Sequence, residues 1–393
     1  MAALICVLGR QPGIGIAELE ALMGAGAVTP FGSNCAIVRG DTNKISQRDL
    51  GGTMKIAEII ATMPSANWGG VSSASLGKII NYATNRWAHQ EHKLSLGLSV
   101  YGFNVKREQI WRLSFELKKR LKEKGHSARV TLGQDQALNS AQVIYNKLIS
   151  EFGAEFILVA DSKQTHIART ISVQDIERYS KRDYGKPGRD TKVGMLPPKL
   201  AQIMLNLAGV SATTTVLDPF CGTGVVLMEA ALKHAKLMGS DLRSEMVETT
   251  KKNLEWLSEE YGFAVNTKGI VCADATTTRW KGRFDRVVSE IYLGPALTKL
   301  PKDDSFDGIV SQCNNLLKKF MVNLRPQLSK GSRCCIAVPV WNTPKGLVRL
   351  PLADQLGSLG YEREKFTHTR NDKLIYRRQD QIVARELLVL TAK

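Results

Sequence analysis

One nine-residue stretch, Val-Leu-Asp-Pro-Phe-Cys-Gly-Thr-Gly at positions 216–224, most constrains the fold of this chain. It starts as a short apolar strand, turns through two glycines and leads into an apolar helical segment at residues 225–235. A strand, a glycine turn and a helix in this order form the nucleotide-binding corner of a Rossmann-like sheet. Gly222 and Gly224 let the backbone pass close to a ligand and adopt positive φ angles. The stretch therefore predicts an open α/β domain with a ligand at the carboxyl end of its first strand.

Acidic residues follow three successive predicted strands of this domain. Asp218 ends the first strand, Asp241 follows residues 237–240, and Asp274 follows residues 269–272. Asp241 comes 23 residues after Asp218, close to the spacing of roughly 20 residues expected for an acid that binds ribose hydroxyls. The Asp218 carboxylate favours a positively charged ligand group over a pyrophosphate, and amides at a helix start suit a carboxylate. We expect a cationic nucleoside ligand, with Asp274 near its adenine amino group.

The segment Asp-Pro-Phe-Cys-Gly-Thr-Gly closely resembles motif I of the methyltransferases that modify exocyclic amino groups. This resemblance implies S-adenosylmethionine as the cofactor, and it implies that the helix within residues 194–208, before motif I, also serves the cofactor. The expected cofactor-binding residues are Pro197, Asp218, Pro219, Phe220, Cys221, Gly222, Thr223, Gly224, Asp241, Leu242, Asp274 and Ala275.

A second signal lies where the fourth predicted strand, residues 286–288, runs into Ser-Glu-Ile-Tyr-Leu-Gly-Pro at 289–295. In the enzymes that this chain resembles, this place carries Asp, Asn or Ser, then two prolines and an aromatic residue. An exocyclic amine conjugated to a base ring is a poor nucleophile, so acceptors must bind its protons while an aromatic face holds the ring. We expect Ser289 as an acceptor and Tyr292 as the stacking surface. Glu290 replaces the first proline; it either accepts a proton or hydrogen bond from the substrate or caps the following turn.

The charge of the chain points to a polyanionic partner. Lys and Arg number 54 against 37 Asp and Glu, a formal net charge of +17, which is typical of proteins that bind nucleic acids. A predicted helix at residues 106–124 carries most of one basic cluster, and residues 178–192 form another. Solvated helix faces and an interdomain connector are the competing interpretations. The expected RNA-binding residues are Lys106, Arg107, Lys118, Lys119, Lys122, Arg129, Arg182, Lys186 and Arg189.

Composition excludes several other classes of protein. Hydrophobic residues make up 43% and charged residues 23% of the chain, which argues against extensive disorder. No apolar run approaches the roughly 20 residues of a membrane-spanning helix. The seven cysteines form no CxxC pair and have no histidines at zinc spacing, so we expect neither a metal site nor a disulfide framework, and we expect a cytoplasmic protein.

Taken together, the C-terminal half resembles the THUMP-domain RNA methyltransferases, in particular the branch that makes N2-methylguanosine at tRNA position 10. The resemblance rests on Arg182-Asp-Tyr184, the 194–208 helix, motif I, Tyr292 and residues 376–385. It implies an α/β chain with a ferredoxin-like domain at residues 1–65, a THUMP-like RNA-binding domain at 92–177 and a Rossmann-like class I methyltransferase domain at 178–393. The Ser-, Gly- and Ala-rich residues 63–75 predict a loop between the first two.

Three other functions stay open at this stage. A DNA amino-methyltransferase is the nearest rival, because the two motifs do not distinguish nucleic acids, although the N-terminal half favours RNA. A non-catalytic RNA-binding protein would explain the missing prolines, but it would have no need of the acids at Asp218, Asp241 and Asp274. Methylation of a small molecule fits poorly with the charge of +17. We therefore expect methylation of an exocyclic amino group in RNA, with guanine N2 in tRNA as the first candidate.

Overall fold

The computed structural model describes residues 3–42, 45–88, 92–189, 195–378 and 381–393. The chain divides into two compact units. The first holds residues 1–12 and 23–176, and the second holds residues 13–22 and 177–393. Among the described residues, no helix has both the length and the apolar character that crossing a membrane requires.

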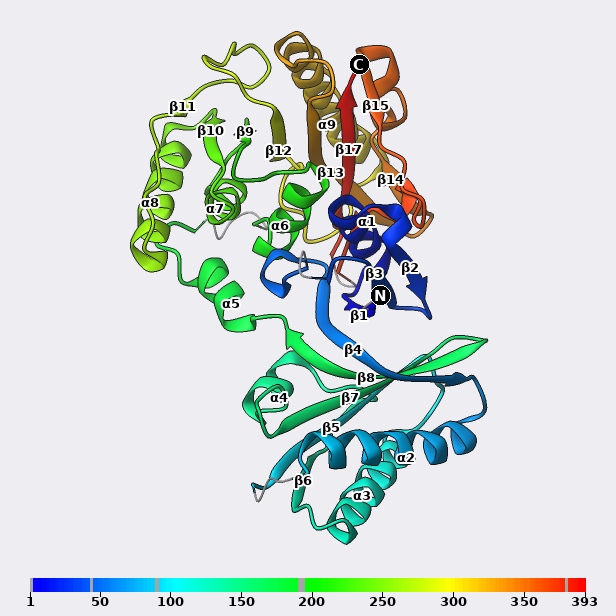
Figure 1. The fold of residues 1–393 in the computed structure, drawn as a ribbon. Helices are drawn as coiled ribbons and strands as arrows, with labels where there is room; N and C mark the ends of the chain where they lie inside the picture. Colours follow the sequence, from blue (N-terminus) through cyan, green and yellow to red (C-terminus); the bar gives the residue numbers. More distant parts are fainter. Residues whose placement is uncertain (1–2, 43–44, 89–91, 190–194, 379–380) are drawn as a thin grey trace. The chain divides into compact units, whose positions relative to one another are not determined.

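The first unit is built on one eight-stranded sheet in the order β2-β3-β1-β4-β8-β7-β5-β6 (Figure 1). Only β5 pairs in parallel, with β6 and β7, and the other neighbours are antiparallel. Because the long β4 pairs with both β1 and β8, residues on either side of position 65 contribute to the same sheet. The strands are β1 (Ala3–Leu8), β2 (Val28–Phe31), β3 (Cys35–Arg39), β4 (Thr53–Pro64), β5 (Leu94–Tyr101), β6 (Ala128–Thr131), β7 (Gly153–Ala160) and β8 (Gln164–Val173).

The described part of this unit also contains the α-helices α2 (Trp68–Arg86), α3 (Arg107–Glu123) and α4 (Ser140–Tyr145). The apolar sides of α2 and α3 pack with β5 and β7 in one buried cluster. The loop predicted at residues 63–75 is wrong for most of its length, because α2 begins at Trp68. The Asn67 side chain accepts a hydrogen bond from Gly70 N (3.0 Å) and so caps this helix. Burial of Val71 and Leu76 then outweighs the low helix propensity of the Ser and Gly residues.

The second unit contains a nine-stranded sheet whose main path is β11-β10-β9-β12-β13-β17-β15. The strands from β11 to β13 are parallel, and β17 inserts antiparallel between β13 and β15. The chain thus runs outward from β9 to β11 and then restarts at β12 on the other side of β9. The strands are β9 (Thr215–Asp218), β10 (Lys236–Asp241), β11 (Ile270–Cys272), β12 (Arg286–Glu290), β13 (Arg333–Thr343), β14 (Gly346–Arg349), β15 (Tyr361–Arg363), β16 (Ile375–Tyr376) and β17 (Val383–Ala392).

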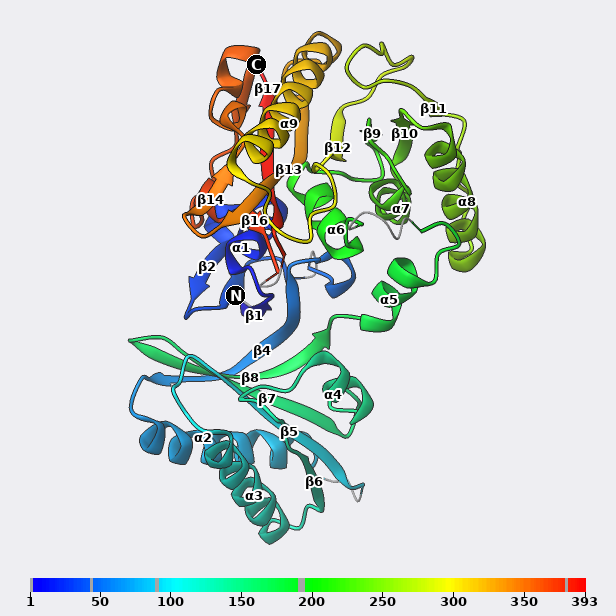
Figure 2. The same cartoon turned by 180° about the vertical axis from the view of Figure 1, so that it is seen from behind.

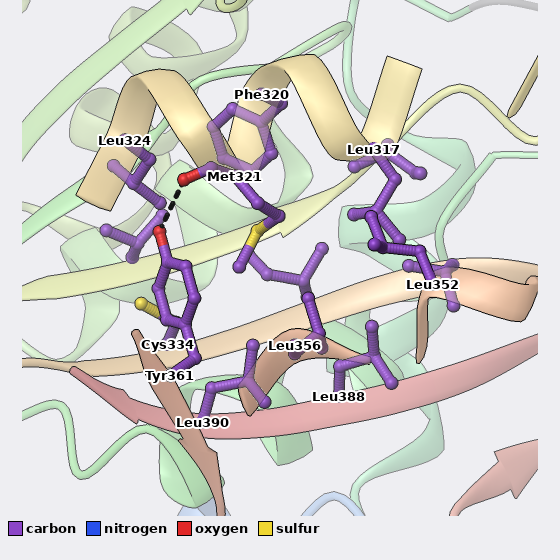
Figure 3. Packing of buried hydrophobic residues seen from close by; sticks show 14 of the residues in the cluster. Leu317, Phe320, Met321, Leu324, Cys334, Leu352, Leu356, Tyr361, Leu388 and Leu390 are labelled. Atoms are coloured by element: carbon purple, nitrogen blue, oxygen red, sulfur yellow. Dashed lines mark hydrogen bonds between the residues drawn. The ribbon is translucent and has the colours of Figure 1, made fainter. Parts of the chain in front are cut away.

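Helices cover both faces of this sheet. Figures 1 and 2 show α1 and α9 on opposite sides of β13 and β17. On one face α1 and α6 share a buried cluster with β9 and β13, and on the other α9 packs against β13 and β17. In the cluster beneath α9, the Tyr361 hydroxyl donates a hydrogen bond to Met321 O at 2.9 Å (Figure 3). The helices are α1 (Pro12–Met23), α5 (Ile176–Tyr184), α6 (Pro198–Leu207), α7 (Val225–Leu232), α8 (Ser244–Tyr261) and α9 (Asp303–Leu324).

The helix α1 is remote in sequence from the rest of the second unit, yet its residues 13–22 belong to it. Ile14 and Ala17 are buried in the cluster with α6. Asn206 Nδ2 donates to Glu18 Oε1 at 2.7 Å, and the Glu20 carboxylate accepts from the amides of Thr367 and His368. The helix α1, at residues 12–23, therefore helps to cover one face of the second sheet.

Candidate active site

The three acids expected around a ligand lie together in the second unit. Asp218, Asp241 and Asp274 line a cavity of about 560 Å³ at the carboxyl ends of β9, β10 and β11. Glu290 and Tyr292, at the end of β12, line the same cavity. This is the edge where the strand order reverses between β9 and β12, the usual ligand position in open α/β sheets.

Most of the residues predicted to bind the cofactor or to act in catalysis border this cavity. The predicted residues that line it are Asp218, Pro219, Phe220, Cys221, Gly222, Thr223, Asp241, Leu242, Asp274, Ala275, Glu290 and Tyr292. Pro197, Gly224 and Ser289 do not line it, although their sequence neighbours Leu196, Thr223 and Glu290 do. Residue 194, which the prediction included at the start of the helix, lies outside the described residues, and that helix begins at Pro198.

The glycine turn has the conformation that its sequence predicts. Gly222 and Gly224 adopt φ angles of 53° and 83°, which L side chains rarely adopt. A Cβ added at Gly224 would come within 2.8 Å of the Thr250 side chain. Backbone geometry and close packing therefore both require glycine at this position.

Two residues of α8 that the sequence did not single out hold this turn. The Thr250 hydroxyl donates to Gly222 O (2.8 Å), and Asn253 Nδ2 donates to Thr223 O (2.8 Å). Asn253 also exchanges hydrogen bonds with both backbone groups of Gly188. Both side chains are buried, so they fix the turn in a place where water cannot replace them. Their sequence signal is weak, since they lie about 30 residues downstream on an ordinary amphipathic helix.

Asp241 and Asp274 are oriented by backbone amides. Asp241 accepts from Gly222 N through Oδ2 and from Arg243 N through Oδ1, each at 3.0 Å. Asp274 Oδ1 accepts from the amide and the hydroxyl of Thr276 at 2.8 and 2.7 Å. These bonds fix both carboxylates at the rim of the cavity before any ligand binds.

Asp218 is the buried acid of the site, with 2% of its surface exposed. Its Oδ1 accepts from the Ser289 hydroxyl at 2.6 Å and from Phe220 N at 3.3 Å. Burial raises the pKa of Asp218 to about 7, although these two hydrogen bonds oppose the shift. A cationic ligand group beside Asp218 would favour its ionised form and so bind more tightly to it.

The end of β12, where the sequence predicted catalytic residues, differs from the expectation at one residue. Ser289 is fully buried, and its hydroxyl faces Asp218. Its hydroxyl therefore orients Asp218, and because Ser289 does not line the cavity, its expected role as an acceptor for the base needs correction. Tyr292 is 42% exposed at the cavity, so its ring is available for stacking. Arg385 Nε donates to Glu290 Oε1 at 2.5 Å, a contact across 95 residues that the sequence did not reveal.

The predicted RNA-binding residues fall into two groups. Seven are exposed, namely Lys106, Arg107, Lys118, Lys119, Lys122 and Arg129 in the first unit and Arg189 in the second. Arg182 and Lys186 are buried, and Arg182 forms an ion pair with the buried Glu229 (2.5 Å). Because a phosphate contact requires a surface cation, the RNA-binding role of Arg182 and Lys186 needs correction. Arg182 instead joins α5 to α7.

The cavity fits the cofactor that the motif implies. Its volume matches that of a typical small-molecule site, and its deepest acid, Asp218, suits a sulfonium or ammonium charge. Asp241 and Asp274 also line the cavity, where their carboxylates offer the acceptors that ribose hydroxyls and an adenine amine require, and the glycine turn allows close backbone approach. Among the described residues, no group of His, Cys, Asp and Glu side chains is arranged to hold a metal ion.

Comparison with known proteins gives a consistent result. Residues 188–349 match the model of the RMKL-like methyltransferase domain, UPF0020. Two curated proteins named tRNA (guanine(10)-N2)-dimethyltransferase are similar to parts of the chain. The protein from Methanothermobacter thermautotrophicus is 33% identical over 146 residues, which are 37% of this chain and 39% of that protein. The protein from Pyrococcus abyssi is 38% identical over 111 residues, which are 28% of this chain and 31% of that protein. The matches thus span less than half of these relatives.

Solved structures show the same fold over a longer range. The crystal structure of TrmN from Thermus thermophilus covers 100% of both chains at a TM-score of 0.56 and 15% identity. At that identity the likeness is one of fold. The likeness to the solved structure confirms the class I methyltransferase fold, and the matches show that residues 188–349 are similar to a methyltransferase domain of the RMKL-like type.

Proposed function

We propose that this chain transfers a methyl group from S-adenosylmethionine to an exocyclic amino group of a base in RNA, with guanine N2 in tRNA as the substrate group. The observation that carries the proposal is a single cavity lined by Asp218, Asp241, Asp274 and Tyr292. The names of the curated relatives support tRNA and guanine as the substrate class. Because the matches cover less than half of those relatives, substrate and partner remain part of the proposal.

The bound cofactor would supply an electrophilic methyl group on a sulfonium centre. Asp218 would face the positive charge of its methionine part, and Asp241 would accept from its ribose hydroxyls. The Tyr292 ring would hold a base by stacking, worth roughly 1 to 3 kcal/mol. If the base lies within a helical stem, it must leave the stack to enter the cavity, at a cost of a few kcal/mol.

The first unit is proposed to bind the RNA. Residues 1–65 and 92–177 are the proposed ferredoxin-like and THUMP-like modules, and they share one sheet. The exposed Lys118, Lys119 and Lys122 lie on α3, where they can contact phosphates without reading sequence. Residues 178–393 complete the proposed division as the catalytic domain.

Labelled S-adenosylmethionine, unmodified tRNA transcripts and duplex DNA test the proposal directly. The protein is incubated with each nucleic acid, the product is digested, and the labelled nucleoside is identified. Label in N2-methylguanosine supports the proposal, and label in DNA overturns it in favour of a DNA amino-methyltransferase. Cofactor binding without transfer would indicate a non-catalytic RNA-binding protein. Asp241→Asn protein prepared in the same way shows whether the label comes from a contaminating enzyme.

A further inference from the structure

The Glu290 carboxylate is held at the edge of the cavity by a residue two strands away. Glu290 ends β12 and pairs with Ala337 of β13, whereas Arg385 of β17 pairs with Pro339 of β13. The Arg385 side chain therefore reaches across β13 to donate its Nε–H to Glu290 Oε1 at 2.5 Å. The two side chains are 5% and 17% exposed. A buried and charge-assisted hydrogen bond of this kind fixes the direction of the carboxylate.

The ion pair leaves the carboxylate with unused acceptor capacity toward the cavity. Glu290 lines the cavity, and its Oε2 accepts no hydrogen bond from any residue within the described ranges. An ionised carboxylate offers about four lone-pair sites and no donor. Burial raises the pKa of Glu290, and Arg385 opposes that shift by favouring the charged form. The cavity thus contains an oriented group that can only accept hydrogen bonds while it is ionised.

We propose that Glu290, positioned by Arg385, selects guanine by accepting hydrogen bonds from the guanine N1–H and amino group. This inference rests on the proposed function and adds the group that recognises the base. Guanine is the base whose amino group stands next to a ring N–H, so two adjacent donors face an acceptor-only carboxylate. In adenine and cytosine the amino group stands beside a ring nitrogen with a lone pair, which repels a carboxylate.

Tyr292 cannot supply this selection, because stacking on an aromatic ring tolerates every base. The selection must come from hydrogen bonds to the edge of the base. In the enzymes that the motif resembles, proline stands at the position of Glu290 and offers no polar side chain. The departure from the motif therefore places a carboxylate that can recognise the edge of a base at the end of β12.

The experiment compares Glu290→Gln with the wild-type chain on unmodified tRNA transcripts and labelled S-adenosylmethionine. The amide keeps the shape of the side chain but replaces one acceptor by a donor, a pattern that suits the adenine and cytosine edges. We expect kcat/KM for N2-methylguanosine formation to fall about 100-fold, since a hydrogen bond to a charged group is lost. We also expect the ratio of labelled N6-methyladenosine and N4-methylcytidine to N2-methylguanosine to rise.

Glu362→Gln is the matched control, because Glu362 is an exposed carboxylate on β15 of the same sheet. Its kcat/KM should stay within about twofold of wild type. Calorimetry with S-adenosylhomocysteine shows whether Glu290→Gln keeps a folded cofactor site. Arg385→Gln should change the base ratio in the same direction as Glu290→Gln, and Arg385→Lys should restore part of the selectivity. A purely structural Arg385 would alter stability and leave the base ratio unchanged.

The outcomes separate this inference from the proposed function. Unchanged guanosine methylation by Glu290→Gln overturns the role of Glu290 and leaves the methyltransferase function intact. Wild-type label on adenosine or cytidine overturns guanine selection together with guanine N2 as the proposed substrate group, and it leaves methyl transfer to an amino group of RNA intact. Cofactor binding without any labelled nucleoside from the wild-type chain overturns both proposals.

Discussion

Ser289 donates its hydroxyl hydrogen to Asp218 across two neighbouring parallel strands, with 2.6 Å between Oγ and Oδ1. Ser289 is fully buried, and Asp218 is 2% exposed. A residue from the end of β12 therefore stabilises the acid that would face the cofactor. This bond joins the end of β9 to the end of β12, the two parts of the site that the sequence predicted separately.

Replacing Ser289 by alanine should weaken binding of the cofactor and leave binding of the base unchanged. Loss of the hydroxyl removes a hydrogen bond that lowers the pKa of Asp218, so Asp218 should become more protonated at neutral pH. We expect the Kd for S-adenosylmethionine at pH 8, measured by calorimetry, to rise about tenfold. Ser329→Ala removes an exposed serine and should change nothing. A reduced kcat with unchanged cofactor affinity would contradict this assignment and favour direct contact with the base.

The stability of the ligand-free chain should depend on pH through Asp218. Its pKa in the folded chain, about 7, lies above the ordinary value of 3.8 because of burial. For an acid with a raised pKa, the associated stability is complete below about pH 4 and is lost as pH rises through 7. The ligand-free chain should therefore lose thermal stability across this range, and Asp218→Asn should lose less.

The same ionisation should strengthen cofactor binding, because the cationic ligand prefers the carboxylate. We expect affinity for S-adenosylmethionine to rise from pH 6 to pH 8 and binding at pH 6.5 to release protons. Calorimetry in two buffers of different ionisation enthalpy measures this release. An affinity independent of pH in this range would show that Asp218 does not face the charged group.

Two glycines in the left-handed region allow a controlled test of the motif I turn. Gly224 has a φ of 83° and would place a Cβ 2.8 Å from Thr250, whereas Gly262 has a φ of 69° and no neighbour within 4 Å of an added Cβ. Gly262→Ala should destabilise the chain by about 1 kcal/mol through backbone strain alone. Gly224→Ala should cost more and should also weaken cofactor binding, as measured by thermal unfolding and calorimetry. Equal losses in both variants would mean that Thr250 moves aside.

The sequence predicted best the features that depend on local order along the chain. Asp218, Asp241 and Asp274 could be placed together because parallel strands end at one edge of a sheet. The partners that hold the site could not be found in this way. Thr250 and Asn253 reach the turn from a helix about 30 residues downstream, and Arg385 reaches Glu290 across 95 residues.

The prediction that Arg182 and Lys186 bind RNA was wrong for a physical reason. Arg182 and Lys186 stand among other basic residues, and a charge count cannot tell which of them face the core. Arg182 is buried because Glu229 on α7 neutralises it. The packing of α1 with α6 was equally hidden, because the start of the chain reads as part of a separate N-terminal module.

Asp241 and Tyr292 line one cavity, but their replacement should affect different steps: Asp241 should matter for cofactor binding and Tyr292 for binding of RNA. Asp241→Ala removes a carboxylate that also holds Gly222 N, so cofactor binding should fall below detection in calorimetry. Tyr292→Ala should leave cofactor affinity within about twofold and raise KM for RNA, since stacking contributes roughly 1 to 3 kcal/mol per base. Equal loss of cofactor affinity in both variants would contradict this division of roles.

The exposed lysines of α3 should determine how RNA binding responds to salt. Each phosphate contact contributes about 0.7 to 0.9 to the slope of log K against log salt concentration, because binding releases counterions. Replacing Lys118, Lys119 and Lys122 by glutamine should therefore lower the magnitude of this slope by about 2 to 3, measured by filter binding of a tRNA transcript. The matched control replaces Lys318, Lys319 and Lys330, three exposed lysines of the second unit, and removes the same net charge. If both triple variants lower the slope equally, RNA follows the overall charge of the chain and α3 is not its binding surface.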